Sequence, residues 1–142
     1  MDDFYFMRRA LEQAEKAFDK NEIPVGAIIT IQGQIIAQAH NLTELLTDVT
    51  AHAEMQAITV ASNYLGGKYL KDCTLYVTLE PCTMCAGALY WSQISKVVFG
   101  ASDPKRGFQT TGVKLHPKTQ IIGGVLADES SKLLVDFFEK RR

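Results

Sequence analysis

The chain has 142 residues, of which 46% are hydrophobic and 22% charged, and its formal net charge is −1. This length fits a single domain over residues 1–142, with a core that needs no disulfide bonds. The composition is that of an ordinary globular protein, and no apolar run approaches the ~18 residues of a membrane span. The acidic start, Met1-Asp2-Asp3-Phe4, is unlike a secretory signal, so we expect a cytoplasmic protein.

The first predicted elements are a helix, a hairpin and a second helix. Apolar residues at steps of three and four predict an amphipathic helix near the N-terminus: Phe4, Met7, Leu11, Ala14 and Phe18. Two β-rich runs, 25–31 and 35–39, flank Gln32-Gly33-Gln34 and predict a hairpin. A polar loop from His40 then leads to a helix over about residues 51–62.

The second half alternates strands and helices. We expect a strand over 74–79, a helix from Pro81 to about Trp91, and a strand over 96–100. An irregular stretch, 101–119, precedes a short strand over 120–122 and a last helix over about 128–141. The last helix presents one apolar face: Leu133, Leu134, Phe137 and Phe138. This alternation predicts an α/β fold in which helices cover both faces of a mixed sheet.

Two short segments carry residues that bind metals. His52 and Glu54 lie in Thr50-Ala51-His52-Ala53-Glu54, and Cys82 and Cys85 lie in Glu80-Pro81-Cys82-Thr83-Met84-Cys85. One imidazole and two thiolates suit Zn²⁺, and three protein ligands leave one coordination position for water. With only three cysteines in the chain, two of them in C-x-x-C, metal or redox chemistry is favoured over a disulfide framework.

The spacing within the two segments predicts where the metal lies. Cys82 and Cys85 are three apart at a helix start, so their sulfurs share one face, and the helix N-terminus favours their thiolate forms. His52 and Glu54 are two apart and would diverge on a regular helix. Both serve one site only if the metal lies beyond the helix N-terminus. We therefore expect two helix N-termini to converge on one zinc ion.

Glu54 has a role in this arrangement that is separate from metal binding. Zinc with two thiolates and a neutral imidazole is formally neutral, so it acidifies water less than an all-histidine site does. A carboxylate beside the metal can take that proton and return it to a ring nitrogen and then to a departing amine. The alternative is a structural zinc knot or a redox C-x-x-C, but a knot needs a fourth ligand and a dithiol needs no H-x-E.

Charge is unevenly distributed along the chain. Residues 1–95 hold six Lys/Arg against eleven Asp/Glu, whereas residues 96–142 hold nine against five. Lys105 and Arg106 lie in a stretch without acids, and the chain ends on Arg141-Arg142. These four residues could contact an RNA phosphate backbone. Ordinary solvated charges at loops and at a helix end are the alternative.

The joined pattern H-x-E…P-C-x-x-C is the zinc deaminase signature. The chain resembles the cytidine deaminase-like superfamily, and most closely its bacterial tRNA adenosine deaminases, which convert the wobble adenosine to inosine. The resemblance extends over nearly the whole chain and includes Ile23–Ala27, Asn41, Thr50–Glu54, Thr74–Cys82, Met84–Ala88, Val97–Ala101, Asp103, Gly124–Asp128 and Phe137-Phe138. It implies a three-layer α/β/α sandwich with a five-stranded sheet, one Zn²⁺ per subunit, a homodimer, and the tRNA anticodon loop as partner.

The resemblance also implies roles for individual residues. His52, Cys82 and Cys85 match the zinc ligands, and Glu54 matches the proton shuttle. Asn41 matches the side chain that hydrogen-bonds the flipped base, Val25 a substrate-binding position, and Asp103 a residue near the flanking nucleotide. Without the resemblance, Asn41 and Asp103 read as turn residues.

Two other functions remain open at this point. The chain could deaminate a free base or nucleoside of the guanine or cytosine type, and Tyr90-Trp91 is similar to guanine deaminases of the same superfamily. Dimer or core packing is the alternative for those two aromatic residues. The chain could also be a zinc-binding RNA or dimerisation module without activity. We expect Cys73 to be a buried thiol at a strand start, and His40 and His116 to be loop residues.

Overall fold

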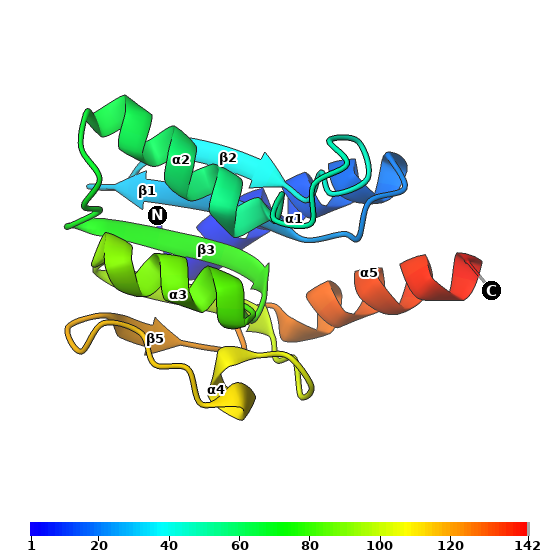
Figure 1. The fold of residues 1–142 in the computed structure, drawn as a ribbon. Helices are drawn as coiled ribbons and strands as arrows, with labels where there is room; N and C mark the ends of the chain where they lie inside the picture. The colour runs from blue at the N-terminus through cyan, green and yellow to red at the C-terminus, as the bar shows by residue number, and fades with distance from the viewer. Residues whose placement is uncertain (142) are drawn as a thin grey trace.

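A computed structural model describes residues 1–141 of the chain (Figure 1). Its centre is one five-stranded sheet of order β2-β1-β3-β4-β5. The strands are β1 (Gly26–Ile31), β2 (Gln34–His40), β3 (Cys73–Leu79), β4 (Lys96–Ala101) and β5 (Gln120–Ile122). β1 pairs antiparallel with β2 and β3, while β3, β4 and β5 run parallel, which confirms the predicted mixed sheet.

The β1–β2 hairpin closes through a two-residue turn. Gln32 and Gly33 both have positive φ, 50° and 76°, as a type I′ turn requires. This turn sets the pairing of Ile31 with Gln34, and a β-bulge between Ile29 and Thr30 then shifts the register by one residue, so that Gly26 pairs with His40. His40 is therefore a buried strand residue and not the loop residue expected from the sequence, because the strand continues to its pairing with Gly26.

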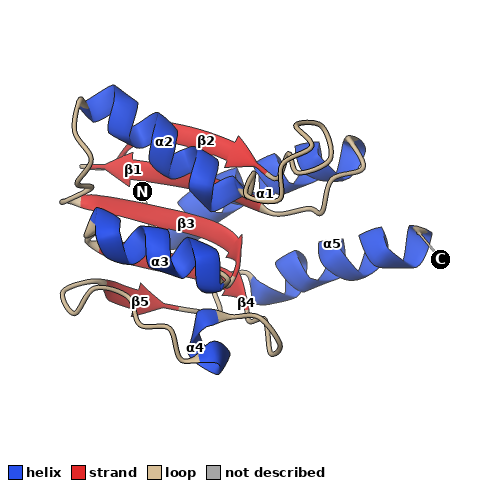
Figure 2. Ribbon diagram, viewed as in Figure 1, coloured by secondary structure: helices blue, strands red, loops and turns tan. Residues whose placement is uncertain are grey.

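Helices cover both faces of the sheet, in three layers (Figure 2). The helices are α1 (Asp3–Asp19), α2 (Ala53–Leu65), α3 (Thr83–Ser92), α4 (Phe108–Thr111) and α5 (Ala127–Lys140). Successive strand residues point to opposite faces: Leu75 and Val77 pack with α2 and α3, whereas Tyr76 between them packs with α1. The predicted three-layer α/β/α sandwich is confirmed.

Helix α1 packs directly on β1, but its apolar face differs in part from the prediction. Met7, Leu11 and Ala14 are buried as expected, whereas Phe4 is 57% exposed. Phe6 is buried in its place, because its ring packs on Tyr76 with centroids 5.2 Å apart. Gly26 allows this close approach, since a Cβ there would lie 2.1 Å from the Ala10 carbonyl oxygen.

The structure corrects several predicted boundaries. Helix α2 begins two residues later than expected and continues to Leu65, where Gly66 ends it with φ 70°. Helix α3 begins at Thr83 and not at Pro81, because the backbone of its N-cap, Cys82, is extended. The stretch expected to be irregular contains the short helix α4. Among residues 1–141, no helix combines the length and apolar character that crossing a membrane requires.

Candidate active site

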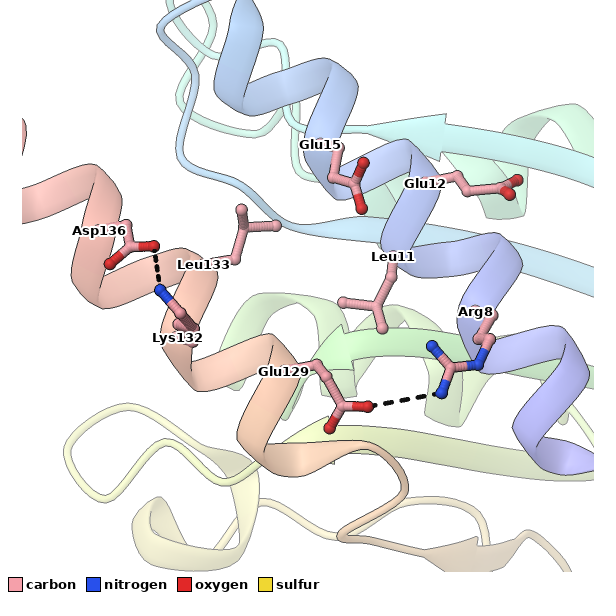
Figure 3. A pocket seen from close by; sticks show the side chains of 8 residues that line it. All are labelled: Arg8, Leu11, Glu12, Glu15, Glu129, Lys132, Leu133 and Asp136. Carbon is pink, nitrogen blue, oxygen red and sulfur yellow. Dashed lines mark hydrogen bonds and ion pairs between the residues drawn. The ribbon is translucent and has the colours of Figure 1, made fainter.

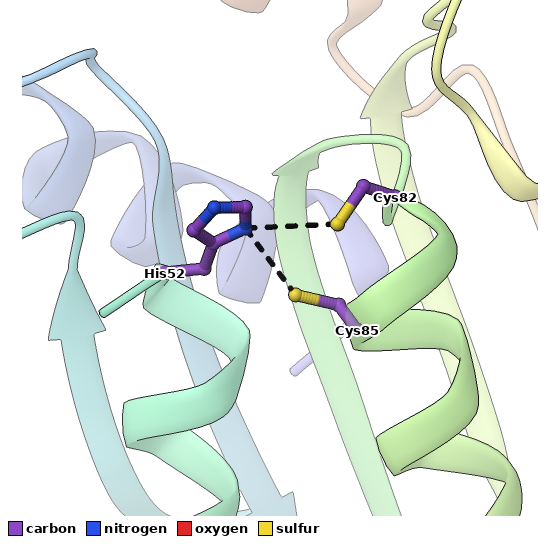
Figure 4. Close-up of side chains that lie close together, drawn as sticks. All are labelled: His52, Cys82 and Cys85. Carbon is purple, nitrogen blue, oxygen red and sulfur yellow. Dashed lines mark hydrogen bonds between the residues drawn. The ribbon is translucent and has the colours of Figure 1, made fainter. Parts of the chain in front are cut away.

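Two helix N-termini meet at one end of the sheet. His52 is the N-cap of α2, Cys82 is the N-cap of α3, and Cys85 lies in the first turn of α3. Their side chains point toward one another, with His52 Nδ1 lying 3.7 Å from Cys82 Sγ and 3.5 Å from Cys85 Sγ (Figure 4). The structure thus brings together the three side chains predicted as metal ligands, in the arrangement that their spacing required.

These distances match the edges of a zinc tetrahedron. Zn–S bonds of ~2.3 Å and Zn–N bonds of ~2.0 Å at tetrahedral angles place nitrogen and sulfur about 3.5 Å apart. The three ligand atoms lie within 4.8 Å of one another, and no other His, Cys, Asp or Glu of residues 1–141 joins the group. The donor set and its geometry therefore fit a zinc ion bound by three protein ligands.

The two thiols are electrostatically unequal in the absence of a cation. The hydrogen bond from Cys85, and then that from His52, lowers the pKa of Cys82 to about 4. The same hydrogen bond, together with burial, raises the pKa of Cys85. The hydrogen bond to Cys82 also raises the pKa of His52. The shift at Cys82 favours its thiolate form, and a cation bound between the two sulfurs favours loss of the proton of Cys85 as well.

Glu54 lies in the first turn of α2, two residues after His52, and is 4% exposed. Burial is the main cause that raises the pKa of its carboxyl group to about 7. A carboxyl group with a pKa near neutrality can both accept and donate a proton at working pH. Glu54 is therefore suited to take up a proton and to give it back.

Asn41 joins the end of β2 to the start of α2. It is 6% exposed, and its Oδ1 accepts a hydrogen bond from the Ala53 backbone N–H at 2.8 Å. The turn interpretation and the substrate interpretation of Asn41 are therefore compatible. Because Oδ1 faces the N–H of Ala53, the Nδ2 group is the part of the amide left to donate to a ligand.

His52, Glu54 and Cys82 lie in a cavity of about 400 Å³. Val25 and Asn41 line it on the β1–β2 side, and Asp103 and Arg106 line it on the opposite side. The structure thus gathers most of the residues predicted to contact substrate. The remaining lining residues are Ile23, Leu79, Glu80, Ser102, Pro104, Leu134 and Phe138.

Part of this lining was missed by sequence reasoning. Leu134 and Phe138 were predicted only as part of an apolar helix face, yet they form a wall of the cavity, and Phe138 is 48% exposed. Glu80 carried no predicted role. The one signal for it was an acidic residue directly before the Pro81-Cys82 pair at the end of a buried strand.

The predicted basic residues are not all at the cavity. Arg106 lines it, and Lys105 is exposed in the same turn, where the Asp103 carboxylate accepts the backbone N–H of both residues. Arg141 does not line the cavity: its guanidinium donates to the Asn21 carbonyl and lies 4.4 Å from the Phe137 ring centroid. Arg142 lies outside the described residues.

A second cavity, of about 360 Å³, lies between α1 and α5 (Figure 3). Its lining is mostly charged, and ion pairs join Arg8 to Glu129 and Lys132 to Asp136. It holds neither a histidine nor a cysteine. Its two cations pair with two of its four acids, and it offers no metal-binding nitrogen or sulfur, so we place the candidate active site at the His52–Cys82–Cys85 group.

Known proteins share this fold and this site. A family profile described as the cytidine and deoxycytidylate deaminase zinc-binding region matches residues 1–101. The chain is 48% identical to a tRNA-specific adenosine deaminase of Aquifex aeolicus (strain VF5), over 97% of this chain and 95% of that protein. It is 45% identical to one of Bacillus subtilis (strain 168), over 99% of this chain and 91% of that protein.

A solved structure from studies of A-to-I editing by tRNA deaminases at the wobble position superposes with a TM-score of 0.84. The two sequences are 39% identical, and the superposition covers 92% of this chain and 99% of the chain in that structure. The cytidine deaminase-like fold expected from the sequence is therefore confirmed. With identities this high over nearly its full length, the chain belongs to the tRNA-specific adenosine deaminases within the zinc-dependent deaminase family.

Proposed function

We propose that this protein deaminates adenosine to inosine in RNA by hydrolysis, at the wobble position of a tRNA anticodon. The observation that carries the proposal is the meeting of three zinc-binding side chains with a buried carboxyl group in one cavity. The relatives named above support the choice of tRNA as substrate.

His52, Cys82 and Cys85 would hold the zinc ion, with Nδ1 as the histidine ligand atom. Zinc bound in this way supplies a Lewis acid with one coordination position open to water. Glu54 takes a proton from the attacking water and delivers it to the ring nitrogen next to the reacting carbon. The water oxygen bonds to that carbon as a hydroxyl group, and the proton of this group passes through Glu54 to the amino group. The carbon–nitrogen bond then breaks, ammonia leaves, and the hydroxyl oxygen becomes the carbonyl oxygen of inosine.

The remaining cavity residues position the base. The free Nδ2 group of Asn41 donates to a nitrogen on the edge of the purine, and the buried side chain of Val25 packs against the ring. A base reaches such a cavity only after leaving its stack, which costs least in an unpaired anticodon loop.

Basic side chains at the rim suit the phosphates on either side of the target. We assign this role to Lys105 and Arg106, which lie beside the cavity, and to Arg141 and Arg142 on the basis of their charge. Replacing Arg106 with Ala should weaken tRNA binding and reduce its salt dependence, with zinc content unchanged. Binding that is independent of salt would contradict this assignment.

We also infer a cytoplasmic homodimer. Helices α2 and α3 lie side by side on one face of the sheet (Figure 1). Both carry exposed aromatic residues near their C-terminal ends. Tyr64 is 59% exposed and Trp91 is 76% exposed, which is typical of residues that pack against a partner. Neither Tyr90 nor Trp91 lines the cavity, and Trp91 is exposed, so dimer packing is favoured for this pair over core packing and over a role like that in guanine deaminases. Trp91→Glu should give a monomer in analytical ultracentrifugation.

The direct test is incubation of the zinc-loaded protein with an anticodon stem-loop, followed by detection of inosine by mass spectrometry. Free guanine, cytosine and adenosine serve as parallel substrates. We expect inosine in the stem-loop and no turnover of guanine or cytosine. Turnover of a free base alone would reject RNA editing and favour the other deaminase function.

Glu54→Gln is the matched control for this assay. It should keep one zinc per chain and lose turnover by about 10²–10⁴-fold or more, because proton transfer is lost while the ligands remain. Equal, zero turnover by the wild type and this variant on every substrate would instead favour a zinc-binding module without activity.

A further inference from the structure

Glu80 is a buried acid whose carboxylate contacts the backbone of a single loop. It is 4% exposed, and it forms no ion pair with a cation of residues 1–141. Its Oε1 accepts the Asp103 N–H at 2.9 Å, and its Oε2 accepts the Gln109 N–H at 3.0 Å. One side chain at the end of β3 thus holds both ends of the segment 103–109.

The same segment is fastened to the start of α3. The Pro81 carbonyl accepts the Phe108 N–H at 2.9 Å, and an isolated β-bridge joins Cys82 to Gly107. A Cβ at Gly107 would lie 2.3 Å from the Glu80 carboxylate, so only glycine leaves room for that side chain. The segment and the α3 N-terminus therefore form one packed unit.

The outer side of this segment faces substrate. Asp103, Pro104 and Arg106 line the cavity and are partly or fully exposed, whereas Glu54 lies buried in its lining. This segment therefore offers a rim that the nucleotides next to a base in the cavity can contact. Its position relative to the zinc ligands decides where they can bind.

On the basis of the proposed function, we propose that Glu80 is a positioning residue for RNA recognition. By holding segment 103–109 against α3, it sets the rim that contacts the nucleotides next to the target adenosine. A buried carboxylate without a cation is costly unless its oxygens are hydrogen-bonded. Opening the segment would remove both of its bonds, so the carboxylate favours the docked position.

Glu80→Gln tests this with little change in shape. Its NH₂ group replaces one acceptor oxygen, so a donor meets a backbone N–H and one end of the segment is released. We expect KM for the anticodon stem-loop to rise about tenfold, with kcat changed less than about twofold and zinc content unchanged.

A cycle between protein and substrate separates positioning from a general structural effect. Wild type and Glu80→Gln are assayed on the intact stem-loop and on two loops made abasic directly 5′ or 3′ of the target. If Glu80 acts through the rim, the KM values of the variant and the wild type should differ less than about twofold on at least one abasic loop. The same fold-loss on all three substrates would overturn the proposal.

Two further variants keep the result interpretable. Glu22 is also buried and accepts two backbone N–H groups, from Glu44 and Leu45, neither of which lines the cavity. Glu22→Gln should therefore change KM by the same factor on all three substrates. A change in KM that disappears for this variant on one abasic loop would overturn the proposal. If Glu80→Gln lowers the folded fraction, Gly107→Ala is the substitute, because its Cβ would displace the Glu80 carboxylate. It should raise KM on the intact loop and leave KM unchanged on the same abasic loop.

The two hypotheses fail differently. If the wild type makes no inosine in the intact loop, the proposed function is wrong. If it makes inosine but neither abasic loop couples to Glu80, the function stands and the role of Glu80 is wrong.

Discussion

The two helix N-termini at the site are held in different ways. The start of α2 is held by side chains: the Asn41 amide accepts the Ala53 N–H, and Gln56 Nε2 donates to the carbonyls of His40 and Ala51. The start of α3 has no side-chain cap hydrogen bond from Cys82, and it is held by the backbone of segment 103–109.

This difference separates two tasks. The α2 start carries one predicted zinc ligand and the predicted proton carrier, and Asn41 accepts its first N–H, so we propose that this side-chain network couples metal, acid and substrate. The α3 start provides both sulfurs, and its uncapped N–H groups favour the thiolates. We therefore expect changes at α3 to act mainly on metal binding, and changes at α2 to act on several functions at once.

The largest effect is expected from Cys85→Ser at the α3 start. A hydroxyl group does not replace a thiolate as a zinc ligand, so zinc and all turnover should be lost. Metal analysis after dialysis measures this directly. Cys73→Ala is the control: Cys73 is buried at the first residue of β3, as predicted, and its loss should leave one zinc per chain. Zinc retained by Cys85→Ser would contradict the ligand assignment.

Glu54→Gln should stabilise the metal-free protein at alkaline pH. Burial raises the pKa of Glu54 from 4.5 to about 7, so the folded state holds a proton that the unfolded state has lost between these values. The wild type therefore loses stability as pH rises through this range, and the variant does not. The difference should be about 3 kcal/mol at pH 8 and below about 1 kcal/mol at pH 5.

Urea unfolding of the metal-free proteins at the two pH values measures this difference. Glu15→Gln on the exposed side of α1 should show none of it. If Glu54→Gln raises the free energy of unfolding equally at pH 5 and pH 8, burial does not raise the pKa of the Glu54 carboxyl group.

Asn41 allows its two roles at the α2 start to be separated. Asn41→Ala removes both the cap and the donor, whereas Asn41→Asp keeps an acceptor for the Ala53 N–H and removes only the donor. Stability should fall by about 1 kcal/mol in the first variant alone. Activity, as kcat/KM on the stem-loop, should fall about 10–100-fold in both. Full activity of Asn41→Asp would limit Asn41 to capping.

Gln56→Met should have the smallest effect. It keeps the length of the side chain and removes the hydrogen bonds to His40 and Ala51, so we expect a loss of about 1 kcal/mol in the free energy of unfolding. Zinc should be retained and kcat/KM should fall a few-fold. Gln34→Met, on the exposed β2 start, is the control, and equal effects in both would contradict a specific role for Gln56.

Much of the fold could be predicted from the sequence because local patterns determine it. Runs rich in β-branched and aromatic residues indicated the strands, and Gln32-Gly33 supplied the turn that the hairpin needs. The prediction of core residues was wrong where a contact with another element decides which side chain is buried. Phe6 replaces Phe4 in the core because the Tyr76 ring lies opposite it, and nothing in α1 alone specifies that ring.

The centre of the site was also predictable, since its chemistry is concentrated in two short segments. Because His52 and Glu54 are two residues apart, they cannot lie on the same face of one helix. The metal was therefore predicted to lie beyond the N-terminus of that helix. The walls of the cavity were not predictable in this way. Leu134 and Phe138 are ordinary apolar residues far along the chain, and Glu80 acts through the backbone of segment 103–109, which carries no side-chain pattern.

The order of the site along the chain has a consequence for its assembly during translation. The three predicted zinc ligands lie between residues 52 and 85, while the apolar wall from α5 comes about 50 residues later. A nascent chain on the ribosome acquires the means to capture its metal well before it can enclose a nucleobase. Metal loading can thus precede completion of the cavity, which requires α5.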